Sequence, residues 1–122
     1  MGNHKGTILC VEDQFEVCEL LALALSSLGY EVVKSYTYAD ALEKSLTLFF
    51  NLYIINSGLP DGSGIELCKE IRVRDSLTPI IFTSGSNDIY EFSGAKAAGV
   101  NFILSKPFKL EKLEEVIKQL LG

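Results

Sequence analysis

The chain has 122 residues, of which 48% are hydrophobic and 22% charged, and these values are typical of one folded domain rather than a disordered segment. The net charge of −5 disfavours direct binding to nucleic acid, because an acidic surface repels phosphate backbones. The sequence has no apolar run long enough to span a membrane and no signal peptide. We therefore expect one cytoplasmic domain over residues 1–122, with a disordered terminus at residues 1–5.

Cysteine and histidine are sparse and carry no metal-binding pattern. Cys10, Cys18 and Cys68 are odd in number and lack CxxC spacing, so we expect three free thiols in a reducing compartment, with two or three of them in the core. His4 lies in the polar terminus, where a solvated side chain is the expected state. The sequence therefore predicts no cluster of metal ligands of this kind.

Short runs of β-forming residues alternate with segments in which apolar residues recur every three or four positions. The expected strands are 7–11, 31–35, 52–55, 80–82 and 102–104, and the expected helices are 14–28, 37–48, 63–73, 86–98 and 109–121. Gly29 and Gly99 are expected helix stops, and Thr37 with Asp40 is an expected helix start. Strand 31–35 is polar enough for a sheet edge, whereas strand 52–55 is fully apolar and central. The alternation predicts a doubly wound α/β fold, a parallel sheet with helices on both faces.

Polar side chains follow four of the five expected strands, at the edge where such sheets form their binding sites. They are Glu12 and Asp13, then Asn56, then Thr83 and Ser84, and finally Lys106. We expect two acids, an amide, a hydroxyl and an ammonium group to converge in one shallow pocket. Paired carboxylates suit Mg²⁺, and a lysine and a hydroxyl can bind phosphoryl oxygens. The pocket lacks a charged nucleophile in its middle.

Each of these groups taken alone also has an ordinary structural explanation. An acid pair after a strand is typical of a helix N-terminus, a Lys-Pro dipeptide is typical of a turn, and the Thr-Ser-Gly stretch at 83–85 is typical of a loop. Their joint occurrence after strands one, three, four and five favours a functional pocket.

Four motifs connect this pattern to a known family. They are Ile-Leu-Cys-Val-Glu-Asp at 8–13, Leu-Pro-Asp-Gly-Ser-Gly at 59–64, Pro-Ile-Ile-Phe at 79–82 leading to Ser84, and Ser-Lys-Pro-Phe at 105–108. The intervals 84 − 56 = 28 and 106 − 84 = 22 also fit. The chain resembles the receiver domains of bacterial two-component response regulators over essentially its whole length. The resemblance implies a flavodoxin-like fold with strand order 2-1-3-4-5.

The resemblance also implies a role for each polar residue. In that family an aspartate at the end of the third strand accepts a phosphoryl group from a kinase histidine, and this position is Asn56 here. The implied Mg²⁺ ligands are Glu12, Asp13 and the backbone carbonyl of Gly58. The implied phosphoryl-contacting residues are Ser84 and Lys106, and the switch position, which is commonly aromatic, is Ile103.

The chain departs from the family pattern at two of these positions. Asn56 has no carboxylate, and an amide oxygen is a poor nucleophile toward phosphorus, so an acyl phosphate cannot form on it directly. The lost negative charge also weakens the expected Mg²⁺ site. Ile103 cannot rotate as an aromatic with a polar tip, and we expect it to stay packed. We favour a native Asn56 over an introduced Asp→Asn change, because Asn51 and Ile103 also depart from the usual residues.

We therefore expect a non-enzymatic, atypical receiver that signals through protein–protein interaction. The resemblance implies a sensor histidine kinase, a phosphotransfer protein or a downstream effector as partner. Such a receiver would act by binding partners or by dimerising through the fourth helix, fifth strand and fifth helix, and a possible partner face lies around Ile89, Tyr90 and Phe92.

Two alternatives stay open at this point. The acceptor could be relocated to Ser57 or Asp61, in the loop after Asn56. The chain could also be a flavodoxin-like phosphate or cofactor binder that uses residues 83–87 at a helix N-terminus. Against this second alternative, the GxGxxG fingerprint is absent, and Glu12 and Asp13 would repel a bound phosphate.

Overall fold

A computed structural model describes residues 5–122 and shows the expected alternation of strands and helices. The five long strands are β1 (Thr7–Val11), β2 (Glu31–Ser35), β3 (Leu52–Asn56), β6 (Ile80–Ser84) and β7 (Phe102–Ser105). The helices are α1 (Phe15–Ser27), α2 (Tyr38–Thr47), α3 (Gly64–Arg74), α4 (Ile89–Ala97) and α5 (Leu110–Leu121). Two further strands, β4 (Gly58–Leu59) and β5 (Gly62–Ser63), form a short antiparallel hairpin.

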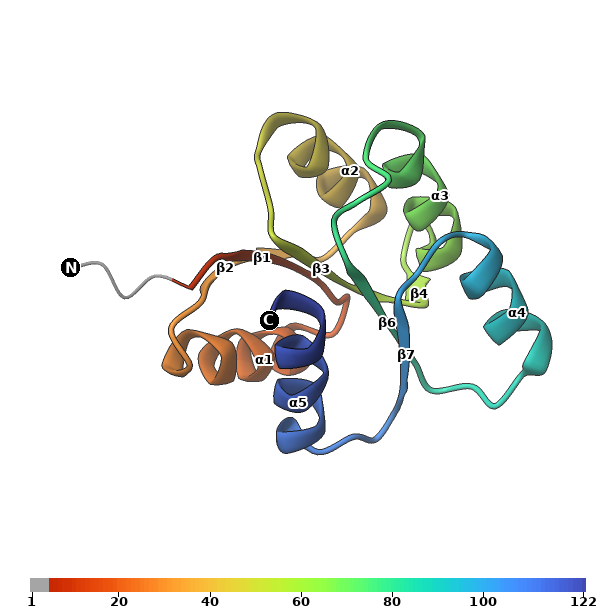
Figure 1. Cartoon of the computed structure of the whole chain (residues 1–122). Helices are drawn as coiled ribbons and strands as arrows, with labels where there is room; N and C mark the ends of the chain where they lie inside the picture. Colours follow the sequence, from red (N-terminus) through yellow and green to blue (C-terminus); the bar gives the residue numbers. More distant parts are fainter. Residues whose placement is uncertain (1–4) are drawn as a thin grey trace.

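The five long strands form one parallel sheet in the order β2-β1-β3-β6-β7 (Figure 1). This order is the predicted 2-1-3-4-5 when the long strands alone are counted. The polar strand β2 lies at one edge and the fully buried strand β3 lies in the middle, as predicted. The sheet therefore brings the carboxyl ends of β1, β3, β6 and β7 side by side.

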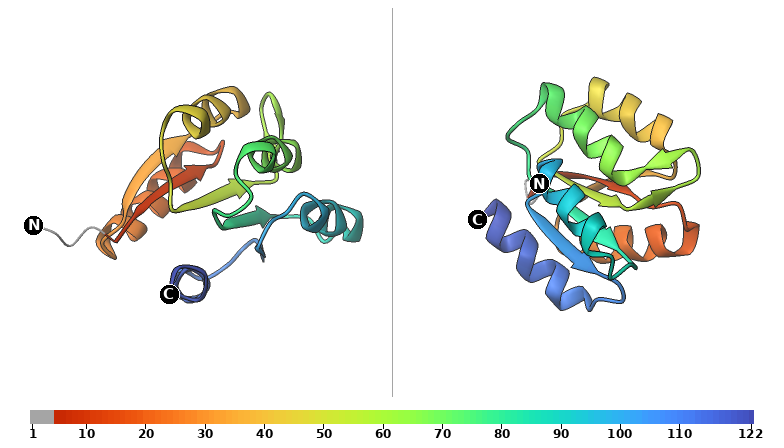
Figure 2. Two further views of the ribbon diagram at one scale, coloured as in Figure 1. Left: turned by 45° about the horizontal axis from the view of Figure 1, so that its top comes forward. Right: turned by 90° about the vertical axis from the view of Figure 1, so that its right-hand side faces the viewer.

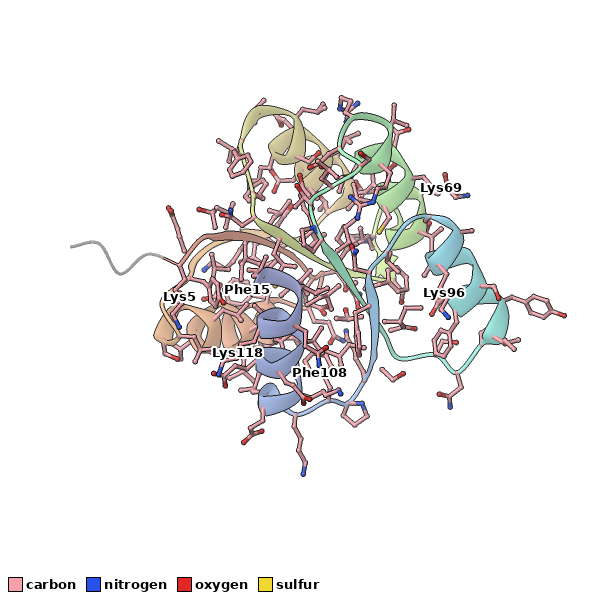
Figure 3. All side chains as sticks on the ribbon, viewed as in Figure 1. Lys5, Phe15, Lys69, Lys96, Phe108 and Lys118 are labelled. Atoms are coloured by element: carbon pink, nitrogen blue, oxygen red, sulfur yellow. The ribbon has the colours of Figure 1, made fainter. Side chains whose placement is uncertain are left out.

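Helices cover both faces of the sheet, with α1 and α5 on one face and α2, α3 and α4 on the other (Figure 2). Side chains fill the space between the layers, whereas Lys69 extends outward from α3 (Figure 3). Successive strand residues point to opposite faces, so Ile54 packs toward α1 and α5, and Ile55 packs toward the other three helices. The doubly wound α/β prediction is confirmed.

The ends of several elements follow local hydrogen bonds. Gly29 and Gly99 end their helices with positive φ values of 103° and 92°, a conformation that glycine adopts without strain. The Thr37 hydroxyl accepts a hydrogen bond from the Asp40 N–H at 3.1 Å, so the predicted cap of α2 is confirmed.

Helix α4 begins at Ile89, three residues after the predicted start. The Ser86 hydroxyl accepts from the Asp88 N–H at 2.9 Å, and the Asp88 carboxylate accepts from the Tyr90 N–H at 2.9 Å. Side-chain acceptors of this kind compete with the helical ladder, so residues 86–88 form a loop and Asp88 becomes the cap.

The β4–β5 hairpin was not predicted, because its strands have only two residues each. The Asp61 carboxylate, at the hairpin tip, accepts hydrogen bonds from the Tyr38 and Ala39 N–H groups at 2.7 and 3.0 Å. These bonds tie the hairpin to the first turn of α2 and hold the pKa of Asp61 below its usual value. A long-range contact therefore fixes this segment.

The three cysteines are free and buried, as predicted, and burial raises the pKa of Cys68 to about 12. At the amino terminus, the Lys5 N–H donates to the Gly29 carbonyl at 2.9 Å, so this end of the expected disordered terminus is anchored. Residues 1–4, including His4, lie outside the described residues. Among the described residues, no helix combines the length and apolar character that crossing a membrane requires.

Candidate functional site

An open pocket of about 530 Å³ lies at the carboxyl edge of the sheet. It is built from the ends of β1, β3 and β7 and from the β4 strand. Its lining residues are Glu12, Asp13, Gln14, Asn56, Ser57, Gly58, Leu59, Pro60, Gly85 and Lys106. The structure therefore brings together the two acids, the amide and the ammonium group that the sequence placed at this edge.

Asn56 is the last residue of β3, and all the polar atoms of its side chain have partners. Its Nδ2 group donates to Asp13 Oδ1 at 3.1 Å and to the Gly58 carbonyl at 2.7 Å. Its Oδ1 atom accepts from the Thr83 hydroxyl at 3.3 Å. The side chain is 8% exposed. The opposite amide orientation would aim Oδ1 at two other oxygen atoms, so the hydrogen-bond partners determine which end of the amide faces the pocket.

Glu12 and Lys106 form the charged pair of the pocket. Lys106 Nζ donates to Glu12 Oε1 at 2.8 Å, and the Gln14 N–H donates to Glu12 Oε2 at 3.0 Å. Glu12 is 2% exposed, whereas the Lys106 side chain is 27% exposed. A buried carboxylate is tolerated when it is paired and hydrogen-bonded, and both oxygens of Glu12 meet this condition.

Ser84 does not contribute its hydroxyl to this pocket. The hydroxyl donates to Glu91 Oε1 of α4 and accepts from the Ser86 N–H at 3.1 Å, and the residue is fully buried. The strand alternation explains the direction. Ser84 follows Phe82 on the face of α2, α3 and α4, whereas Thr83 points to the opposite face and reaches Asn56.

Gly64 allows the hairpin to pass close to the end of β3. Its N–H donates to the Ser57 carbonyl at 2.8 Å. A Cβ atom at this position would lie 2.1 Å from the backbone oxygen of Asn56. Because no side chain fits between the two backbones, the glycine positions the pocket loop against Asn56.

Three oxygen donors in the pocket could face a cation: the Glu12 and Asp13 carboxylates and the Gly58 carbonyl. Each already accepts a hydrogen bond: Glu12 accepts from Lys106, and both Asp13 and the Gly58 carbonyl accept from Asn56. Within residues 5–122, no group of three acidic, histidine or cysteine side chains is placed to hold a metal ion. The donor set therefore fits Mg²⁺ poorly, because N–H groups point at its oxygens.

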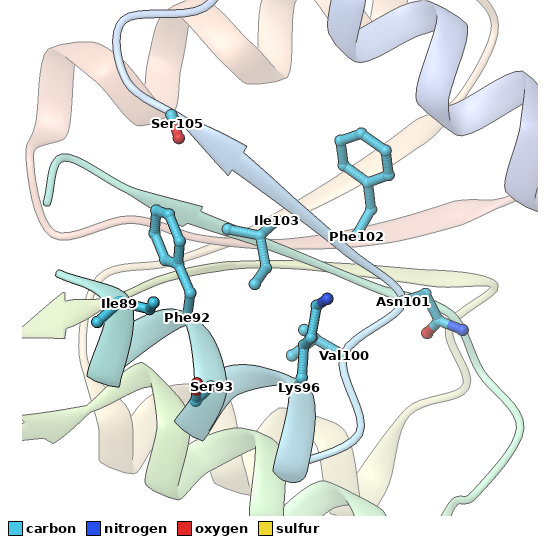
Figure 4. A pocket seen from close by; sticks show the side chains of 9 residues that line it. All are labelled: Ile89, Phe92, Ser93, Lys96, Val100, Asn101, Phe102, Ile103 and Ser105. Atoms are coloured by element: carbon cyan, nitrogen blue, oxygen red, sulfur yellow. The ribbon is translucent and has the colours of Figure 1, made fainter. Parts of the chain in front are cut away.

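A second hollow, a groove of about 620 Å³, lies between α4 and the edge strand β7 (Figure 4). We call it the α4–β7 groove. Its lining residues are Ile89, Phe92, Ser93, Lys96, Val100, Asn101, Phe102, Ile103 and Ser105. Ile103 points toward Phe92 and is packed against the core. Ile89 and Tyr90 are 70% and 83% exposed, respectively, whereas Phe92 is half-buried.

Sequence reasoning missed two contacts at the pocket and one beside it. Thr83 and Gln14 each bond a pocket residue, and Glu91 binds the Ser84 hydroxyl. Gln14 directly follows the acid pair, so its backbone contact with Glu12 is local. The contacts Thr83–Asn56 and Ser84–Glu91 depend on which face of β6 Thr83 and Ser84 occupy, and the sequence carries no clear signal for that face.

The family model of the response regulator receiver domain matches residues 8–118. The chain belongs to this family. The receiver-domain resemblance and the flavodoxin-like topology are thus confirmed.

Individual relatives agree with this assignment. The chain is 34% identical over 114 residues to the response regulator ArlR of Staphylococcus aureus, covering 93% of this chain and 52% of that protein. The chain thus spans about half the length of the curated relatives it matches. A CheY-like receiver domain of Methanospirillum hungatei JF-1 superimposes with a TM-score of 0.92 at 29% identity, covering 94% of this chain and 92% of that one. A Clostridium difficile two-component response regulator gives 0.91 at 28% identity, covering 94% of both chains.

Proposed function

We propose that this receiver domain acts through protein–protein interaction and is not phosphorylated at position 56. The observation that carries the proposal is the Asn56 carboxamide at the acceptor position, with its N–H groups turned toward the pocket. An amide presents no carboxylate nucleophile there. We propose in addition that the domain is a cytoplasmic, non-enzymatic module that contacts neither membrane nor nucleic acid directly, since its net charge of −5 repels phosphate backbones.

The remaining pocket residues keep the roles that the family resemblance implies, in a reduced form. By the resemblance, Glu12, Asp13 and the Gly58 carbonyl would hold Mg²⁺, only weakly here because Asn56 lacks a carboxylate, and Lys106 would contact a phosphoryl group. Ser84 is the second phosphoryl-contacting residue by sequence, and its hydroxyl is held by Glu91 instead.

Receiver domains interact with histidine kinases, phosphotransfer proteins and effector domains. For this chain we assign the partner face to the α4–β7 groove, whose lining includes the exposed Ile89 and Lys96, together with the exposed Tyr90 next to Ile89 on α4. Lys96 forms no ion pair within residues 5–122. The groove therefore suits an effector segment that presents an apolar side chain flanked by a carboxylate. A homodimer through α4, β7 and α5 is the other occupant that sedimentation would detect.

The deciding experiment is phosphorylation by a small-molecule donor. The wild-type chain and Asn56→Asp are incubated with Mg²⁺ and acetyl phosphate at neutral pH, and each is weighed intact by mass spectrometry. We expect one phosphoryl group on the aspartate variant and none on the wild type. A stoichiometric adduct on the wild type would refute the proposal. Uptake by the variant would show that Lys106 and the acid pair still form a working pocket.

The same experiment tests a relocated acceptor. Ser57 lines the pocket, whereas the Asp61 carboxylate is bound to the α2 backbone. Any label on the wild type would be mapped by peptide, and acid-stable phosphate that disappears in Ser57→Ala would assign it to Ser57. A purified protein that is colourless and unchanged by added flavin would exclude the flavin-binding alternative.

A further inference from the structure

The pocket at the carboxyl edge carries two acidic side chains in close proximity, and the chain itself supplies their counter-groups. We infer that the Asn56 carboxamide and the Lys106 ammonium replace a bound cation, so that this domain keeps its pocket formed without a divalent metal. The inference rests on the proposed function and deepens it, because it says how the pocket is maintained when no phosphoryl chemistry takes place at Asn56.

The first support is the hydrogen-bond geometry of the amide. The two N–H bonds of Asn56 go to Asp13 Oδ1 and the Gly58 carbonyl, at 3.1 and 2.7 Å. These two oxygens belong to the donor set that the family resemblance gives to Mg²⁺. The amide nitrogen therefore bridges a carboxylate and a carbonyl in the way that a cation would bridge them. For a cation to bind there, the amide would have to surrender both hydrogen bonds and rotate.

The second support is the pairing of the other acid. Glu12 is 2% exposed, and its two oxygens accept from Lys106 Nζ at 2.8 Å and from the Gln14 N–H at 3.0 Å. Because both oxygens of this buried carboxylate accept hydrogen bonds, Glu12 does not need a metal ion to offset the cost of its burial. Lys106 directly follows β7 and Glu12 directly follows β1, so this pair also connects the ends of two strands that are not neighbours in the sheet.

The third support is the charge count. Glu12, Asp13 and Lys106 carry a net charge of −1 in the pocket, obtained from −1, −1 and +1. An aspartate at position 56 would make this −2, with a second carboxylate facing Asp13 and the Gly58 carbonyl. Two carboxylates within hydrogen-bonding distance repel each other, so an aspartate at position 56 and Asp13 would not readily both ionise unless a cation lay between them. Asn56 therefore leaves the pocket with one negative charge fewer than an aspartate would, so a bound cation has less charge to offset.

Thermal unfolding followed by circular dichroism tests the inference, with each protein measured in EDTA and again in excess Mg²⁺. The wild-type midpoint should be the same in both buffers. Asn56→Asp should unfold at least about 5 °C lower than the wild type in EDTA, and Mg²⁺ should raise its midpoint. Asn51→Asp is the matched control, since it adds the same charge one residue before β3, where Asn51 Oδ1 accepts from the Thr7 N–H at 2.8 Å. It should show no Mg²⁺ response.

Two outcomes would overturn the inference: a wild-type midpoint that rises with Mg²⁺ as much as that of Asn56→Asp, or an aspartate variant as stable as the wild type in EDTA. If Asn56→Asp does not fold, titration calorimetry of the wild type with Mg²⁺ tests the inference instead. Measurable binding in the millimolar range would contradict it. No phosphodonor is present, so the two proposals fail separately. A wild type stabilised by Mg²⁺ that takes no phosphoryl group would overturn this inference and leave the proposed function standing.

Discussion

The pocket at the carboxyl edge and the α4–β7 groove differ in how their side chains are satisfied. In the pocket, the side chains of Glu12, Asn56 and Lys106 all bond to other groups of the same chain. In the groove, Ile89 is 70% exposed, and Lys96 has no ion-pair partner within the described part of the chain. The polar groups of the pocket are therefore hydrogen-bonded within the chain, whereas the apolar surface of the groove is exposed to solvent.

This difference separates two tasks that one signalling domain must perform. A pocket whose donors and acceptors are already paired favours one stable arrangement over a response to a small ligand. An exposed apolar surface next to an unpaired cation gains free energy when a second protein covers it. Binding energy is therefore available at the groove, while the pocket serves to hold the sheet edge in place.

The largest expected effect comes from breaking the pocket at its backbone. Gly64→Ala would place a Cβ atom 2.1 Å from the Asn56 carbonyl oxygen, and overpacking against backbone costs about 3 kcal/mol of unfolding free energy. Urea unfolding measures the loss. Gly58→Ala is the matched control, because a Cβ atom there meets nothing within 4 Å. Equal stability of the two variants would contradict the close approach of the hairpin to β3.

A smaller loss is expected when the charged pair is split. Lys106→Met leaves the buried Glu12 carboxylate without its ammonium partner, and we expect a cost of about 2 kcal/mol, reduced by the partial exposure of Lys106. The double variant with Glu12→Gln should recover part of that cost in urea unfolding.

The control for this pair lies on the surface. Lys69 pairs with Glu66 at 3.3 Å with side chains 53% and 62% exposed, respectively, and Lys69→Met should cost no more than about 0.5 kcal/mol. If Lys106→Met and Lys69→Met lowered the unfolding free energy equally, burial of Glu12 would not be the reason for the cost of Lys106→Met.

The hydrogen bonds between the Asp61 carboxylate and the first turn of α2 should make the stability of the domain depend on pH. The backbone N–H groups of Tyr38 and Ala39 lower the pKa of Asp61, so its folded-state pKa lies below the unfolded value of about 3.9. Its contribution is present above that value and is lost as the pH falls through the folded pKa. Asp61→Asn should therefore flatten the stability curve below about pH 4.

Thermal midpoints measured from pH 6 down to pH 2.5 would follow this contribution. Glu43→Gln, an exposed α2 acid, is the control and should keep the wild-type slope. If the thermal midpoint of Asp61→Asn fell with pH as steeply as that of the wild type, the Asp61 carboxylate would not be what holds the hairpin.

The smallest effect on stability is expected at the groove. Ile89→Ser with Tyr90→Ser should change the unfolding free energy by no more than about 0.5 kcal/mol, because these side chains are mostly exposed. Ile103→Ser, in the same groove, should cost about 1 kcal/mol or more, because Ile103 packs against the core. A large loss in the double variant would remove the contrast between groove and pocket.

Sedimentation velocity of the same proteins identifies the occupant of the groove. A wild type that forms dimers and a double variant that stays monomeric would assign the groove to a second copy of the chain. A monomeric wild type leaves the effector segment as the occupant. Association unchanged by the two substitutions would place the interface elsewhere.

Most of the fold could be predicted because its signals are local. The apolar runs located all five long strands, and Gly29, Gly99 and Thr37 marked helix boundaries that the structure confirms. The β4–β5 hairpin and the late start of α4 were missed. The first depends on Asp61 reaching α2, and the second on serine and aspartate side chains that compete with the helix.

The direction of Ser84 could not be predicted for a related reason. Strand β6 is buried on both faces, so apolar residues follow one another without the alternation that would reveal which face each residue occupies. The sequence therefore places Thr83 and Ser84 at the same edge without indicating which hydroxyl meets Asn56. The pairing of Asn56 with Thr83 across the sheet decides it.

The sequence by itself determined which chemical groups stand at the carboxyl edge, including the amide at position 56 where the family has a carboxylate. It also determined the alternating strands and helices, since periodicity and turn residues are properties of short segments. The tertiary structure alone decided how these groups are paired. Asn56 meets Asp13 and Gly58, and Lys106 meets Glu12, because the crossovers of a parallel sheet bring residues up to 94 positions apart within hydrogen-bonding distance.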